Sequence, residues 1–141
     1  MKKTGKALSL SFTLLALVLE ALPFGAVLQF AKAPDQGGGT TRQAFSYFSL
    51  TPFGYANFGP FLTAMLSCLL LVLLGVLVVV KTPRSLRRLR NASLIVSVLA
   101  LFTSLMPLFF GLSYYSLVGL LLSLALLGVF LTLFINPVSE S

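Results

Sequence analysis

Residues 59–80 read GPFLTAMLSCLLLVLLGVLVVV, and residues 81–90, which follow directly, read KTPRSLRRLR. The first stretch carries no charged side chain, and it is as long as a helix that crosses a hydrocarbon layer about 30 Å thick. Membrane-spanning strands would be about half as long and would alternate apolar with polar residues. The two stretches together predict a transmembrane helix that ends at a basic loop.

The rest of the chain has the same character. Of its 141 residues, 57% are hydrophobic and 9% are charged, whereas a soluble domain carries about a quarter charged residues. Three further apolar runs predict spans at about 7–31, 91–112 and 117–135. We therefore expect an all-α fold, a four-helix transmembrane bundle in which residues 1–141 form a single membrane domain.

The first run also has the basic start and apolar core of a signal peptide, and Ala31-Lys32-Ala33 has the small-x-small form of a cleavage site. The run is about 25 residues long, however, and an apolar signal core has about 7–15 residues. It also contains Glu20 and Pro23. We expect the run to be retained as a helix.

Residues 32–57 form the only long loop that the apolar pattern predicts. Its first half is rich in glycine, and its second half is rich in aromatic residues. Aromatic rings favour the headgroup layer, so we expect this half to lie along the outer interface; the alternative is a binding surface. The aromatic residues are Phe45, Tyr47, Phe48, Phe53, Tyr55 and Phe58.

The basic residues predict the orientation. Residues 1–6 and 81–90 together hold eight of the ten, and only Lys32 and Arg42 fall on the other side. The positive-inside rule then places both termini and the 81–90 loop in the cytoplasm of a cell-membrane protein. We expect the loop to act as a topology signal that rests against anionic headgroups; binding of a specific anionic lipid is the alternative. We expect no nucleic-acid partner, because no aromatic platform accompanies the charges. The headgroup contacts are Lys81, Arg84, Arg87, Arg88 and Arg90.

The first and third runs match at an offset of 84 residues, which suggests two similar helical hairpins (a 2+2 repeat). Apolar sequence of low complexity can also produce such a match by chance. In each run the matched residues are spaced 4, 3, 4 and 3 apart, so they share one helical face. The pairs are Ser9 with Ser93, Thr13 with Ser97, Ala16 with Ala100, Glu20 with Ser104, and Pro23 with Pro107.

The matched faces allow two structural interpretations. Small residues let helices approach closely in lipid, so the faces predict a packing seam; a shallow outward-facing cavity is the alternative. Pro23 and Pro107 should each kink their helix, because a proline lacks the N–H that the helix needs.

Glu20 is the only ionisable residue well inside a predicted span, and no lysine or arginine lies at the same depth. An acid inside a membrane is a functional-site hypothesis by default. Three alternatives stay open: a neutral packing residue, a proton-coupling carboxylate, or a residue at the interface. The candidate hydrogen-bond partners are Ser97, Ser104, Thr63 and Ser67.

Composition weighs against catalysis. The chain has no histidine, one cysteine and three acidic residues. It therefore lacks the Ser/His/Asp and Cys/His triads and the common zinc-ligand sets. We expect no enzyme activity, no metal and no cofactor.

Four helices with one acid in the first resemble the small multidrug resistance exporters, in which that glutamate binds protons and cationic substrates in turn within a dimer. The resemblance implies such a role for Glu20 alone. Those exporters have short loops and line their substrate path with tryptophan and tyrosine, whereas this chain has no tryptophan and a loop of about 25 residues.

Two segments, Leu22-Pro23-Phe24-Gly25-Ala26-Val27 and the stretch 45–61, are similar to segments of uncharacterised small four-transmembrane proteins of anaerobic Gram-positive bacteria. That likeness covers most of the chain, and the family has no assigned activity to carry over.

These features predict a non-enzymatic, multi-pass integral membrane protein, structural or accessory, which works with partner membrane subunits. The alternative is a small proton-coupled transporter that uses Glu20, as a homo-oligomer, because four helices alone enclose little cavity.

Overall fold

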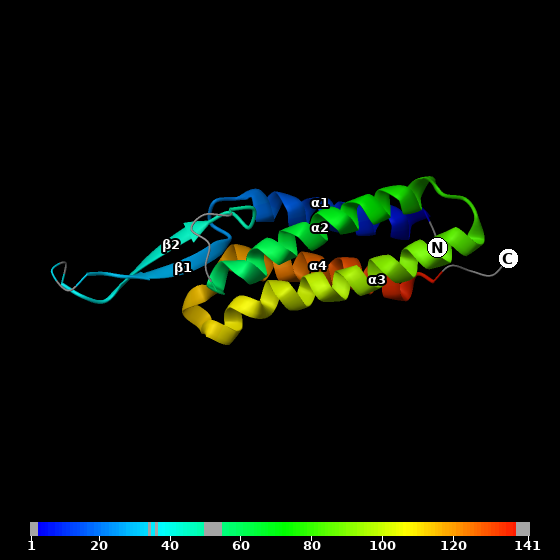
Figure 1. Cartoon of the computed structure of the whole chain (residues 1–141). Coiled ribbons are helices and arrows are strands. Elements are labelled where there is room, and N and C mark those ends of the chain that lie inside the picture. Colours follow the sequence, from blue (N-terminus) through cyan, green and yellow to red (C-terminus); the bar gives the residue numbers. More distant parts are fainter. Residues whose placement is uncertain (1–2, 34, 36, 50–54, 138–141) are drawn as a thin grey trace.

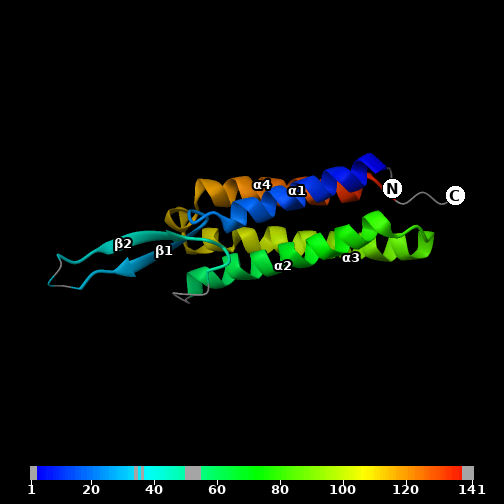
Figure 2. The ribbon, with the colours of Figure 1, turned by 90° about the horizontal axis from the view of Figure 1, so that it is seen from above.

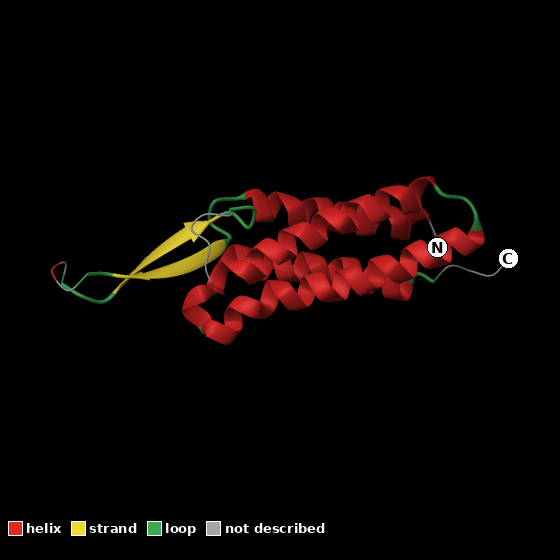
Figure 3. Ribbon diagram, in the orientation of Figure 1, coloured by secondary structure: helices red, strands yellow, loops and turns green. Residues whose placement is uncertain are grey.

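The structure, a computed structural model, describes residues 3–33, 35, 37–49 and 55–137 (Figure 1). Helices dominate it, with one small sheet at one end (Figure 3). Along the chain the elements are α1 (Lys3–Ala21), β1 (Ala26–Ala31), β2 (Thr40–Phe45), α2 (Tyr55–Val79), α3 (Pro83–Leu105), the 3₁₀-helices η2 (Met106–Phe110) and η3 (Leu112–Tyr114), and α4 (Leu117–Ile135).

The four long helices run alternately up and down in two layers. Helices α1 and α4 form one layer and α2 and α3 the other, as the view from above shows (Figure 2). Each helix also packs on one helix of the other layer, α1 on α2 and α3 on α4. The start of α1, the α2–α3 turn and the end of α4 lie at one end of the bundle, and the β-hairpin projects from the other (Figure 1).

All four helices are long and apolar enough to cross a membrane. Their surfaces are the reverse of a soluble protein's, because large apolar side chains face outward and small polar ones are buried. Val18, Val72 and Ile95, for example, are each more than 60% exposed, while Ser9 and Ser93 are fully buried. The prediction of four span-length helices in a bundle is confirmed.

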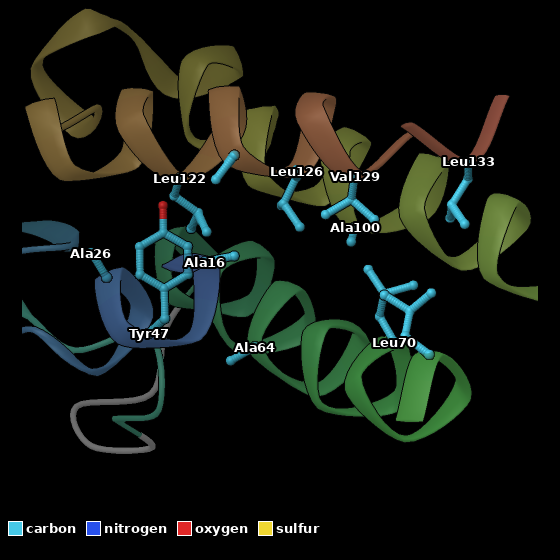
Figure 4. Close-up of a cluster of buried hydrophobic side chains, with 12 residues drawn as sticks. Ala16, Ala26, Tyr47, Ala64, Leu70, Ala100, Leu122, Leu126, Val129 and Leu133 are labelled. Atoms are coloured by element: carbon cyan, nitrogen blue, oxygen red, sulfur yellow. The ribbon is translucent and has the colours of Figure 1, made fainter. Parts of the chain in front are cut away.

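The predicted seam is present in the bundle. The faces of α1 and α3 that carry Ser9, Thr13, Ala16 and Glu20, and Ser93, Ser97, Ala100 and Ser104, have no exposed surface. Large side chains of α2 and α4 fill the space that these small residues leave. They are Leu74 and, as labelled in Figure 4, Leu70, Leu122, Leu126, Val129 and Leu133.

The first helix is shorter than predicted. The predicted span 7–31 is wrong beyond Ala21, where α1 ends, and Pro23 lies in the turn that follows instead of kinking the helix. Two carbonyls of the last turn find donors outside the α-helical pattern: Leu19 accepts from the Leu22 N–H at 3.3 Å, and Glu20 accepts from the Tyr47 N–H at 3.0 Å. These bonds satisfy carbonyls that an α-helix end leaves free.

Helix α3 differs from the predicted third span, 91–112, at both ends. It begins at Pro83, so most of the predicted basic loop 81–90 is its first turns; proline suits a helix start because its missing N–H is not needed there. At the other end, α3 passes at Leu105 into η2, which contains Pro107. The Thr103 carbonyl accepts from the Met106 N–H. Pro107 therefore lies in a 3₁₀ turn and does not kink an α-helix.

The predicted outer loop 32–57 and the last part of the predicted first span contain an antiparallel hairpin, which the all-α prediction missed. Residues Ala26–Ala31 pair with Thr40–Phe45. Gly37, Gly38 and Gly39 all have positive φ, so the turn depends on residues without a side chain. The first half of β1 is buried near α2 and η3, whereas most of β2 is exposed. Phe53 of the predicted aromatic stretch lies outside the described residues.

Candidate functional site

The carboxyl group of Glu20 lies in the last turn of α1 and has no exposed surface. Its Oε1 atom accepts a hydrogen bond from Ser67 Oγ of α2 at 2.6 Å. Its Oε2 atom is buried and has no hydrogen-bond partner among the described residues. One oxygen is thus held by a neighbouring helix, and the other can still accept a proton or a hydrogen bond.

No basic side chain of the described residues forms an ion pair with Glu20. A buried carboxylate without a counter-ion is costly, and the cost is larger still in a membrane. A carboxyl group in such a place favours the neutral form. The group can therefore serve as a proton-binding residue or as a neutral hydrogen-bonding contact between α1 and α2.

The backbone carbonyl of Glu20 forms hydrogen bonds with the segment that directly follows β2. It accepts from the Tyr47 N–H and from Ser46 Oγ at 2.9 Å. The side chain of Tyr47, 1% exposed, lies across the bundle end, with its hydroxyl pointing toward Leu122 of α4 (Figure 4). This residue covers the interior on the hairpin side. The prediction that Tyr47 lies along the outer interface is wrong.

Two glycines make room for the Tyr47 ring. A Cβ at Gly25 would lie 2.7 Å from Tyr47 Cδ2, and a Cβ at Gly119 would lie 3.1 Å from its hydroxyl oxygen. Burial raises the pKa of the Tyr47 phenol well above its usual range, and the neighbouring Tyr115 acts in the same direction. The phenol is therefore neutral at physiological pH.

A second set of polar contacts joins α3 to α4. Ser104 Oγ lies 2.9 Å from Ser123 Oγ, which lies 2.7 Å from the hydroxyl of Tyr115. Hydroxyl groups in an apolar interior are stabilised by such pairs. On the α2–α3 side, Thr63 Oγ1 donates to Thr103 Oγ1 at 2.9 Å.

Of the four predicted partners of Glu20, only Ser67 has a hydrogen bond to its carboxyl group. Ser97 donates to the Leu94 carbonyl of its own helix, Ser104 pairs with Ser123, and Thr63 pairs with Thr103. Sequence reasoning missed Ser123, Tyr115 and Tyr47. The signal for Ser123 was its spacing from Gly119 and Ser116, four and seven residues earlier, at the start of the fourth apolar run.

The predicted headgroup contacts lie at the opposite end of the bundle. Arg90 donates from Nε to the Leu133 carbonyl at 2.9 Å and from a terminal nitrogen to the Phe134 carbonyl at 3.3 Å. It therefore satisfies carbonyls at the end of α4. Lys81, Arg84, Arg87 and Arg88 line grooves at this end.

Within the described part of the chain, no three histidine, cysteine or acidic residues lie together as a metal site would need. Comparisons with protein-family models, with curated proteins and with solved structures find no match. The two resemblances noted from the sequence stay predictions.

Proposed function

We propose that the chain is a multi-pass integral membrane protein of the cell membrane, a non-enzymatic structural or accessory subunit that presents its β-hairpin to a partner membrane protein. The observation that carries the proposal is the hairpin, which projects from a bundle whose outer surface is apolar (Figure 1). The orientation is that of the positive-inside rule, with both termini and the α2–α3 turn in the cytoplasm and the hairpin outside.

The hairpin suits a binding role for two reasons. In the described part of the chain its sheet has only two strands, so each strand has an edge that a partner strand can join. Two strands alone are marginally stable in water, and here the base is held by the buried Ala26, Val27 and Leu28. The base is fixed and the outer half is free for contact.

The proposed experiment is photo-crosslinking in native membranes, from a reactive group placed at Gln43 of β2, followed by purification in mild detergent. We expect a specific partner protein to be captured. The matched control carries the same group at Val72, which faces outward from α2. A variant in which residues 29–42 are replaced by a short glycine–serine linker should fold and lose the partner. A partner retained by that variant, or a lone monomer from the parent chain, would contradict the proposal.

A second candidate, a small proton-coupled transporter working as a homo-oligomer, is favoured by one observation, the unpartnered Oε2 atom of Glu20. Transport would require the sealed interior around Glu20 to open. The test is proton-coupled flux in liposomes, which Glu20→Gln should abolish while expression stays intact. Unchanged flux in the variant, or none in the parent protein, removes this candidate.

The 2+2 repeat also belongs to the proposal. Its support is the way the helices pack. The first helix of each half packs most extensively on the second helix of the other half: α1 on α4, and α3 on α2. Exchanging the two halves of the chain therefore gives the same set of helix–helix contacts. The two halves differ mainly in their connections, the β-hairpin in the first and η2 with η3 in the second. Glu20 and Ser104 occupy equivalent positions, so the acid belongs to only one half.

A further inference from the structure

A groove of about 580 Å³ opens at the end of the bundle where α1 begins and α2 ends. Its residues come from three places: the first turns of α1, the end of α2, and the turn into α3. They are Lys3, Lys6, Ala7, Leu10, Val78, Val80, Lys81 and Leu86.

The groove has a basic part and an apolar part. Lys3, Lys6 and Lys81 supply three ammonium groups, and the remaining five residues are aliphatic. Lys6 Nζ donates to the Leu77 carbonyl at 2.7 Å, which holds this ammonium group at the end of α2. Lys3 and Lys81 are exposed.

No carboxylate of the described residues neutralises these lysines. Of the two acids that the structure describes, Glu20 lies in the last turn of α1 and Asp35 in the hairpin turn, both toward the other end of the bundle. Three positive charges beside an aliphatic wall are complementary to a molecule with an anionic head and an apolar tail.

We propose that this groove binds one anionic glycerophospholipid, with the phosphate among the ammonium groups of Lys3, Lys6 and Lys81 and an acyl chain along Ala7, Leu10 and Val78. The inference rests on the proposed insertion of the bundle in a membrane. It assigns the site to the N-terminal lysines and Lys81 together, whereas the sequence placed the expected lipid contacts within residues 81–90 alone.

The chain has no tryptophan, so a single Val79→Trp substitution, at an exposed residue next to Val78, gives a fluorescent reporter beside the groove. The protein is reconstituted in phosphatidylcholine vesicles that contain a small fraction of brominated phosphatidylglycerol, which quenches tryptophan on contact. We expect stronger quenching than with the same fraction of brominated phosphatidylcholine. Equal quenching by the two lipids would overturn the site, and no quenching by either would instead overturn the insertion.

The decisive comparison is between two variants that lose the same charge at the same end. With Lys3→Gln/Lys81→Gln, the preference for the anionic lipid should fall about five-fold for each lysine, or about 25-fold in all. With Arg84→Gln/Arg88→Gln it should change little. An equal loss in both variants would show general surface attraction and would overturn the site.

Two further arms complete the test. Ala7→Phe fills the groove without changing charge and should also abolish the preference; a retained preference would overturn the placement of the acyl chain. Added inorganic phosphate should not relieve the quenching. Relief would show that the site takes free phosphate and would overturn the lipid as occupant. Circular dichroism of each variant verifies that the helices are formed.

Discussion

Ser67 donates the one hydrogen bond that the described residues give to the carboxyl group of Glu20. Ser67→Ala should therefore leave a buried carboxyl group without a partner, and we expect it to lower the free energy of unfolding by about 1–2 kcal/mol. The measurement is unfolding in mixed micelles by titration with sodium dodecyl sulfate.

Ser97→Ala is the matched control. Its hydroxyl is as deeply buried, but it donates to the Leu94 carbonyl of its own helix. Removing it should change the free energy of unfolding by less than about 0.5 kcal/mol. If the two substitutions cost the same, the Glu20–Ser67 bond does not stabilise the bundle.

Gly25 and Gly75 make a second pair at the residue scale. A Cβ at Gly25 meets the Tyr47 ring at 2.7 Å, whereas a Cβ at Gly75 meets nothing within 4 Å. Gly25→Ala should lower the free energy of unfolding by about 1–3 kcal/mol through overpacking. Gly75→Ala should not lower it, because alanine favours a helix more than glycine does. An unaffected Gly25→Ala protein would mean that Tyr47 is not held against this turn.

At the scale of elements, the apolar runs were sufficient to predict the four helices, because a span of that length has few alternatives. They were insufficient for the ends of α1 and α3. Residues 26–31 are as apolar as a helix end, and only pairing with Thr40–Phe45 makes them a strand. The two strands are separated in sequence by the glycine turn. The periodicity of apolar residues within one segment gives no information about such a pairing.

The same limit applies to the Glu20 site. Spacing along α1 and α3 indicated which side chains face inward, because helical periodicity repeats along one segment. The choice of Ser67 over Thr63, Ser97 or Ser104 depends on how far α2 is shifted along α1, which is set by packing. Tyr47 was missed because its role follows from the path of the hairpin.

Removing the outer part of the hairpin should leave the thermal stability of the helical bundle unchanged. In the variant with residues 29–42 replaced by a glycine–serine linker, the buried base from Ala26 to Leu28 remains, and so do the contacts of Tyr47. We expect its midpoint of thermal unfolding in detergent, followed by circular dichroism, to match the parent's. A large drop in the midpoint would mean that the outer hairpin holds the bundle together and is more than a binding element.

At the scale of the whole molecule, the distribution of side chains is the strongest argument for a bilayer. Fully buried serines and threonines and exposed leucines and valines would be unfavourable in water, and they are favourable where lipid surrounds the bundle. The basic residues at one end are the basis of the proposed orientation, in which the hairpin lies on the other side of the membrane.

The most direct test of the proposed membrane topology is cysteine labelling in intact cells, in a Cys68→Ala background, with a maleimide that does not cross membranes. We expect a cysteine at Thr41, in the hairpin, to be labelled from outside. A cysteine at Ser85, beside the α2–α3 turn, should be labelled only after the membrane is permeabilised. Labelling of both positions from the same side, or the reverse pattern, would contradict the proposed four crossings with the hairpin outside.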